Sequence, residues 1–256
     1  MTTMLPLRLV INAGPCEEVV ARCLASVRAQ RYPAWTATVT IDPAGDRTFE
    51  RAVDAADGDP RLSIVRNAQR RYSMANLIAG ISRARAGPED VIVVLDGDDW
   101  LYGDTALDTI AAAYVRHDCW MTYGSWISND PSHQGIQRGL WPAYDDDTVD
   151  FRHAEWRHTA VRTWKRWLWD RVDDRDFRDT RGEYFRVTED QASMLPMLEM
   201  SGTGRARHIP EVLMVYNRMT PHACGRTHLA EMRANADLLR ARRPYARLEG
   251  HATRSG

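Results

Sequence analysis

The chain has 256 residues, of which 44% are hydrophobic and 27% are charged, so it can bury a core of ordinary size. Its formal net charge of −1 gives no electrostatic reason to expect a nucleic acid or an anionic membrane as a partner. No apolar run approaches the roughly 20 residues that span a bilayer, and Met1–Pro6 lacks the pattern of a signal peptide. We therefore expect a cytoplasmic protein without a transmembrane segment, in which the four cysteines stay reduced.

The first half of the chain alternates between two hydrophobic patterns. Short apolar runs that are typical of strands occur at Leu7–Ile11, Trp35–Ile41 and Val91–Leu95. Apolar residues at helical spacing occur at Cys16–Gln30, Met74–Ile81 and Leu107–Val115. In Trp35–Ile41 the apolar residues alternate with threonines, which predicts a half-buried strand. The alternation of strands and helices predicts an α/β fold with a mostly parallel central sheet and helices on both faces.

The pattern changes between about Trp120 and Trp169. Seven of the nine tryptophans lie there among prolines and polar residues, so we expect long loops and short elements over the ligand-binding edge of the sheet. The spacing of Trp164, Trp167 and Trp169 favours packing on a helix as their main role. Regular order is expected to return near Thr188, with a last helix at Leu229–Arg242 and a frayed end from about Leu248 onward.

Polar residues follow three of the predicted strands. Asn12 and Ala13 come after the first strand, Asp42 after the second, and an acidic run after Val91–Leu95. Ligands of open α/β sheets bind beyond the carboxyl ends of the strands. We therefore expect these residues to converge on one edge of the sheet.

The acidic run Asp96-Gly97-Asp98-Asp99 places three carboxylates directly after a buried strand. Three negative charges so close to one another repel, and a divalent cation such as Mg²⁺ or Mn²⁺ relieves the repulsion. Gly97 allows a tight turn or a close approach to a ligand. An EF-hand loop is excluded by Trp100 and Leu101, whereas a phosphatase-type aspartate and a solvated acidic turn remain alternatives.

Several segments, taken in order, resemble the family 2 glycosyltransferases of the GT-A fold. They are the acidic run with Trp100 and Leu101, Cys23–Val27 with Gln30–Pro33, Ile41–Asp46, Asn67–Asn76 and Thr188–Gln191. The resemblance covers roughly residues 7–125 and, more loosely, 184–217. It implies a Rossmann-like GT-A domain over residues 1–225, followed by a C-terminal helix and tail at 226–256. Within that domain, about 1–125 would bind the nucleotide-sugar, and 126–225 would bind the acceptor and carry out catalysis.

The resemblance also implies a role for individual residues. The donor, a UDP-sugar in the favoured interpretation, would be bound by Ala13, Asp42, Arg71, Asn76, Asp96 and Gly97. The metal, Mn²⁺ or Mg²⁺, would be held by Asp98 with Asp96, and His222 is a further candidate ligand. Asp190 would be the general base, and the acceptor hydroxyl, on a glycan, a protein or a small molecule, would lie near Trp100, Glu189 and Trp126.

Local sequence supports the assignment of Asp190. Thr188 and Gln191 have the spacing of a capping box, which would place Asp190 in the first turn of a helix, where the dipole favours an anion. Three features depart from the family pattern. Ala13 stands where an aromatic residue would line the base, Pro43 stands where an aspartate is common, and one residue is inserted between Asn67 and Asn76, the segment that contains Arg71. The alternatives are a nucleotidyltransferase, for which the glycine-poor, unbasic Ala13–Glu18 is unfavourable, and a GT-A-like domain that binds a nucleotide-sugar or glycan without turnover.

Overall fold

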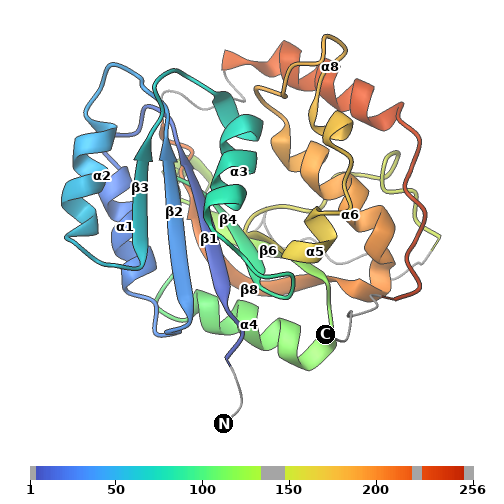
Figure 1. The fold of residues 1–256 in the computed structure, drawn as a ribbon, viewed down its shortest axis with the longest axis horizontal. Coiled ribbons are helices and arrows are strands. Elements are labelled where there is room, and N and C mark those ends of the chain that lie inside the picture. Colours follow the sequence, from blue (N-terminus) through green and yellow to red (C-terminus); the bar gives the residue numbers. More distant parts are fainter. Residues whose placement is uncertain (1–3, 134–147, 221–226, 251–256) are drawn as a thin grey trace.

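The computed structural model describes residues 4–133, 148–220 and 227–250, and the strands in these ranges form one sheet in the order β3-β2-β1-β4-β7-β6-β8-β5 (Figure 1). Its parallel part consists of β1 (Leu7–Ala13), β2 (Trp35–Ile41), β3 (Leu62–Arg66) and β4 (Val91–Asp96). Ala13 lies opposite Ile41, and Asn12 lies opposite Asp96. The carboxyl ends of these strands therefore meet at one edge, as the sequence predicts.

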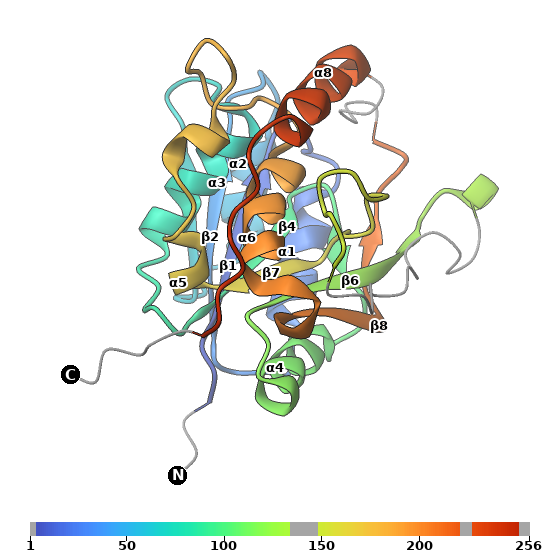
Figure 2. The same ribbon diagram turned by 90° about the vertical axis from the view of Figure 1, so that its right-hand side faces the viewer.

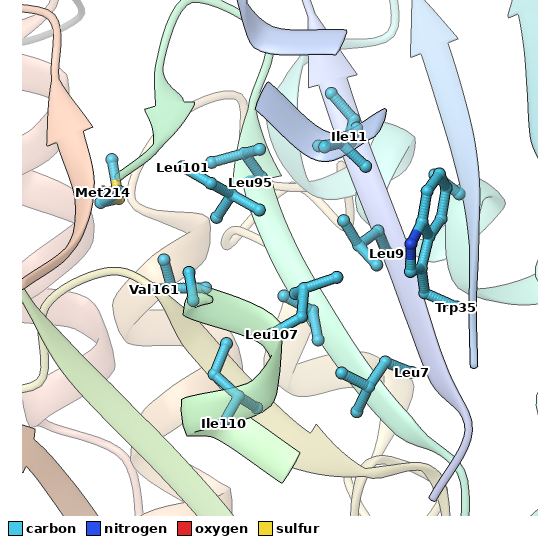
Figure 3. Packing of buried hydrophobic residues seen from close by; sticks show 14 of the residues in the cluster. Leu7, Leu9, Ile11, Trp35, Leu95, Leu101, Leu107, Ile110, Val161 and Met214 are labelled. Carbon is cyan, nitrogen blue, oxygen red and sulfur yellow. The ribbon is translucent and has the colours of Figure 1, made fainter. Parts of the chain in front are cut away.

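Helices cover both faces of the parallel part, which confirms the predicted layers. They are α1 (Val20–Arg28), α2 (Thr48–Ala56), α3 (Tyr72–Arg83) and α4 (Ala106–His117). Alternate residues of β1 enter two different cores: Leu9 and Ile11 pack with α1 and α4, whereas Val10 packs with α3. Figure 3 shows Leu9 and Ile11 in the first core, together with Leu107 of α4.

β2 is more deeply buried than its alternating pattern predicts. Thr38 and Thr40 are 4% and 0% exposed, because α3 packs over the threonine face of the strand. Thr40 satisfies its hydroxyl by donating to Asn12 Oδ1 at 2.8 Å, so the polar side chain is tolerated in the interior.

The second part of the sheet is mixed. It contains β5 (Trp100–Leu101), β6 (Met121–Ser128), β7 (Arg162–Lys165) and β8 (Ala206–Tyr216). β7 lies antiparallel to β4 and β6, so a late segment of the chain lies directly beside the central strand. The expectation of long loops and short elements between Trp120 and Trp169 is therefore wrong for residues 121–128, which form a long strand, whereas β7 is a short element. These strands lack a clear hydrophobic pattern because they bury hydroxyl groups. Thr122 and Thr163 hydrogen-bond each other at 2.6 Å, and the Tyr114 hydroxyl hydrogen-bonds Thr163 at 2.8 Å.

The remaining elements pack on one face of the sheet or flank it. They are η1 (Pro131–His133), α5 (Arg166–Trp169), η2 (Asp174–Phe177), α6 (Glu189–Arg205) and α8 (Leu229–Arg240). Trp164 and Trp169 stack with their ring centroids 5.6 Å apart, which confirms the predicted packing role. The predicted helix is wrong for Trp164, which lies in β7, whereas Trp167 and Trp169 belong to α5. None of the described helices is both long and apolar enough to cross a membrane.

The segment after α8 runs along α6 rather than fraying from Leu248 onward (Figure 2). The Leu248 amide donates to the Met200 carbonyl at 2.9 Å, and its side chain packs against the second core. The predicted frayed end is therefore wrong at Leu248, and residues 251–256 lie outside the described ranges. Cys16, Cys23 and Cys119 are buried free thiols, as expected, and Cys224 also lies outside the described ranges.

Candidate active site

The turn that follows β4 is fixed by contacts with β1. The Gly97 amide donates to the Asn12 carbonyl at 2.8 Å. A β-carbon on Gly97 would lie 2.7 Å from Cβ of Ala13 and 3.0 Å from its Cα. Glycine is thus required here by the close approach of the neighbouring strand, and Ala13 is the small residue that permits this approach.

Asp99 differs from the other two carboxylates of the turn because it is structural. It is 2% exposed, and its Oδ1 accepts a 2.7 Å hydrogen bond from the Asn217 amide after β8. The Asp99 amide in turn donates to the Asp96 carbonyl at 3.0 Å. Asp99 therefore ties the turn to β8 and leaves Asp96 and Asp98, both partly exposed, as the carboxylates available to a ligand.

The three carboxylates occupy an environment that disfavours negative charge. Desolvation raises the pKa of Asp96 to about 7, and the nearby charges of Glu189, Asp98 and Asp190 add to this, while Arg162 opposes it. Desolvation also raises the pKa of Asp98 and, together with the charges of Asp98 and Asp96, that of Asp99. A cation bound here would relieve this repulsion.

Asp42 lies at the end of β2 in a buried hydrogen-bond network. Its Oδ1 accepts from Asn67 Nδ2 at 2.8 Å and from the Arg71 amide at 3.0 Å, and its Oδ2 accepts from the Tyr72 amide at 2.9 Å. Asn67 Nδ2 also donates to Asn76 Oδ1 at 2.7 Å. The structure thus brings Asp42, Asn76 and the backbone of Arg71 together, with the Arg71 side chain exposed.

Glu189 and Asp190 lie in the first turn of α6, as predicted, but the predicted capping box is wrong. Thr188 has a φ of 69° and caps nothing with its side chain, because this left-handed backbone turns the hydroxyl into a buried position without a partner among the described residues. Desolvation and the neighbouring Glu189 raise the pKa of Asp190. The start of α6 lies near the end of β4, because Arg162 of β7 is opposite Val94 of β4 in the sheet and forms an ion pair with Glu189 at 3.0 Å.

Arg162 lies between these two groups of acids and was missed as a site residue. Arg162 is 5% exposed, and its Nη1 pairs with Glu189 Oε1 at 3.0 Å. The available signal was a charged residue between Val161 and Thr163, both of which are buried.

The aromatic candidates for acceptor binding differ in exposure. Trp100 is 6% exposed, and the Arg22 guanidinium lies 3.8 Å from its ring centroid. Trp126 is partly exposed and lies 5.1 Å from the ring of Tyr216, which is 38% exposed. Tyr216 adjoins the acidic site because the next residue, Asn217, donates its amide to Asp99, and desolvation and the charges of the β4 turn raise the pKa of Tyr216 to about 12. His222 lies outside the described ranges.

The sequence matches a known family over most of its length. The model described as "Glycosyl transferase family 2" matches residues 10–178. No curated protein sequence matches the chain.

Solved structures show the same GT-A fold. The structure of S. aureus TarS 1-349 in complex with UDP-GlcNAc has a TM-score of 0.64 at 13% identity, over 85% of this chain and 60% of that chain. The mannosyltransferase PcManGT from Pyrobaculum calidifontis, in complex with GDP-Man and Mn²⁺, has a TM-score of 0.63 at 16% identity, over 95% of this chain and 67% of that chain. The present chain thus spans about 60% of the length of the TarS fragment. Identities this low show the fold alone.

Proposed function

The chain belongs to glycosyl transferase family 2, and on this premise we propose that it transfers a sugar from a nucleoside-diphosphate donor to a hydroxyl acceptor, with inversion of the anomeric carbon. The observation that carries the proposal is the meeting of two acidic groups. Asp96 and Asp98 follow β4, and Glu189 and Asp190 begin α6. Arg162 lies on β7 directly beside β4 and pairs with Glu189 at 3.0 Å, and the charges of Glu189 and Asp190 raise the pKa of Asp96. Such a pair of environments suits a site that binds a diphosphate at one end and activates a hydroxyl at the other.

The base of the nucleotide is proposed to lie against Asp42, at the end of β2. A carboxylate offers about four acceptor positions, and three backbone and side-chain donors already occupy this one. The remaining position can accept the ring N–H of uracil or guanine, whereas adenine and cytosine have no ring N–H on that edge and would have to donate from their exocyclic amino groups. We favour a UDP-sugar, with Ala13, Asn76 and Gly97 shaping this end of the site and the exposed Arg71 side chain available to the diphosphate.

The residues of the β4 turn fit a divalent cation shared with the diphosphate. Among the described residues, no three His, Cys, Asp or Glu side chains converge closely enough to enclose a metal by themselves. Mg²⁺ and Mn²⁺ in diphosphate sites usually need only one or two carboxylates, and Asp98 with Asp96 would supply these. His222 stays a candidate ligand. When bound, the cation would supply Lewis-acid stabilisation of the departing nucleoside diphosphate.

Asp190 is proposed to be the general base. Its raised pKa makes the ionised carboxylate a better proton acceptor, and the first turn of α6 favours that ionised form. Asp190 would take the proton of the acceptor hydroxyl while the oxygen attacks the anomeric carbon. The new C–O bond forms as the bond to the diphosphate oxygen breaks on the opposite face, which inverts the configuration.

The acceptor is proposed to approach between the start of α6 and the ends of β6 and β8. Glu189 lies beside the proposed base, and the partly exposed Trp126 offers a ring face to a sugar. Trp100 would support the acceptor site from the interior and not by stacking on the acceptor, because Arg22 covers its ring. In this arrangement about 1–125 would bind the donor, and 126–225 would bind the acceptor.

The test is a thermal-shift screen of UDP, GDP, ADP and CDP, with and without Mn²⁺. We expect metal-dependent stabilisation by UDP, because a ligand that binds only the folded state raises its apparent stability. Asp98→Asn should abolish the metal dependence. Asp57→Asn is the matched control, because Asp57 is exposed at the end of α2 and its left-handed backbone also suits asparagine. A wild-type protein that responds to no nucleotide would contradict the proposal.

A further inference from the structure

We propose that Arg162 is a positioning residue that holds the start of α6 against the carboxyl end of β4 and so sets the distance between the donor end and the base end of the site. The proposal rests on the proposed function, because it concerns the same reaction. Arg162 has none of the roles assigned above to donor, metal or acceptor residues.

The fold brings Arg162 to this place through the pairing of β7 with β4. In the antiparallel register Arg162 lies opposite Val94, two residues before Asp96. Its guanidinium pairs with Glu189 at 3.0 Å, and both side chains are largely buried, at 6% and 13% exposure. One side chain thus joins the central strand region to a helix that begins 27 residues later in the chain, at Glu189.

The charge of Arg162 is needed where it lies. Three carboxylates act on it electrostatically, namely those of Glu189, Asp96 and Asp190. Two of them belong to α6 and one to β4, so without a cation the two elements would repel each other in a poorly solvated region. The dipole of α6 can stabilise Glu189 and Asp190, but it does not attract the helix to Asp96.

The start of α6 has little else to fix it by capping. Thr188 makes no side-chain cap, and its backbone is in the left-handed region with a φ of 69°. A capping side chain commonly orients the first turn of a helix, but none of the described α-helices of this chain has one, so other contacts must orient α6. In α6 the ion pair between Arg162 of β7 and Glu189 orients the first turn. Because Asp190 follows Glu189 in that turn, the same ion pair also sets the position of Asp190.

The local chemistry also argues against a purely stabilising role. Arg162 Nε is buried and has no partner among the described residues, so the guanidinium is imperfectly satisfied. A buried ion pair often contributes no more stability than well-packed apolar residues of similar volume. A charge kept at this position, with one donor unsatisfied, fits a requirement of the site better than a requirement of the fold.

The experiment compares Arg162→Met and Arg162→Lys with wild type. The readouts are UDP affinity in the presence of Mn²⁺, and kcat and KM for hydrolysis of UDP-GlcNAc, UDP-glucose or UDP-galactose, whichever the wild type turns over. We expect R162M to lower kcat on the order of 100-fold, the effect of a misplacement of about 1 Å, with KM and UDP affinity within about threefold. R162K should recover roughly tenfold of this loss, because lysine keeps the charge but not the fork of donors.

Arg8→Met is the matched control. Arg8 pairs with Asp90 at 2.8 Å at the far end of the same sheet, so its loss should lower the melting temperature and leave kcat unchanged. A double variant tests the route of the effect. Water replaces the hydroxyl acceptor in the hydrolysis assay, so the proposed contact of Glu189 with an acceptor does not enter, and R162M/E189Q should lose no more kcat than R162M alone because Arg162 acts through Glu189.

Several results would overturn the inference. They are wild-type kcat in R162M, a loss of UDP affinity as large as the loss of kcat, or additive losses in the double variant. If R162M does not fold, R162K decides: a folded R162K with wild-type kcat refutes the role. A wild-type protein that neither binds a nucleotide nor hydrolyses a donor refutes the proposed function instead, so the two failures are distinguishable.

Discussion

Replacing Gly97 by alanine tests whether the turn after β4 is fixed by packing against β1. The added β-carbon would lie 2.7 Å from Cβ of Ala13, 3.0 Å from its Cα and 3.2 Å from the Asn12 carbonyl oxygen. Carbon atoms normally pack at about 3.5–4.0 Å. None of the contacted atoms can move by a change of rotamer, so the strands themselves must shift.

The expected cost follows from this geometry. Overpacking of a rigid interior costs about 1–3 kcal/mol, and contacts to backbone and Cβ atoms favour the upper half of that range. For a chain of 256 residues each kcal/mol lowers the Tm by about 2–4 °C. We therefore expect the Tm of G97A without ligand to fall by roughly 4–12 °C.

Gly14→Ala supplies the matched control in the same assay. Gly14 directly follows β1, and a β-carbon there would meet nothing within 4 Å. Its Tm should stay within about 2 °C of wild type, because the site is sterically open. If G97A melts like wild type without ligand but binds UDP weakly, Gly97 serves the ligand and not the strand, and the steric reasoning is refuted.

Three further predictions concern stability and binding. Arg152→Met should cost about 3–5 kcal/mol in a urea titration, because it strands the buried Glu199 carboxylate, and R152M/E199M should recover most of that loss. Burial lowers the pKa of His158 from 6.5 to about 3. Below pH 6.5, therefore, only the unfolded chain gains a proton at His158. As the pH falls, the free energy of unfolding of wild type should decrease more steeply than that of His158→Phe, by up to about 1.4 kcal/mol per pH unit. Equal slopes in the two proteins would contradict this. Asp42→Asn should weaken UDP binding at least about tenfold in calorimetry, because asparagine offers one acceptor oxygen instead of two; unchanged affinity would remove Asp42 from the base site.

The parallel part of the fold could be predicted because burial there follows local periodicity. β1 and β4 are apolar runs covered on both faces, and the helices between them present one apolar side each. β3 escaped prediction because Leu62–Arg66 is short and nowhere fully buried, so its pattern is weak. β7 escaped for the opposite reason, since its buried Thr163 has a hydroxyl partner that only the tertiary fold supplies.

The candidate site was predictable to the extent that its residues follow strand ends or begin a helix. The meeting of Asp42, Asp96 and Ala13 follows from parallel topology, which alternation along the sequence indicates. Arg162 could not be found in this way, because its partner Glu189 belongs to an element that reaches it only after the chain folds. The cap expected of Thr188 failed because local spacing does not determine backbone dihedral angles.

The central claim is that this member of glycosyl transferase family 2 uses Asp190 to activate the nucleophile for the proposed inverting transfer. The most direct test incubates wild type or Asp190→Asn with an α-linked UDP-sugar and Mn²⁺. The anomer of the released sugar is then identified by ¹H NMR. We predict that wild type releases the β-anomer first, and that D190N binds UDP with wild-type affinity but releases no sugar. Initial release of the α-anomer, or undiminished turnover by D190N, would contradict the account.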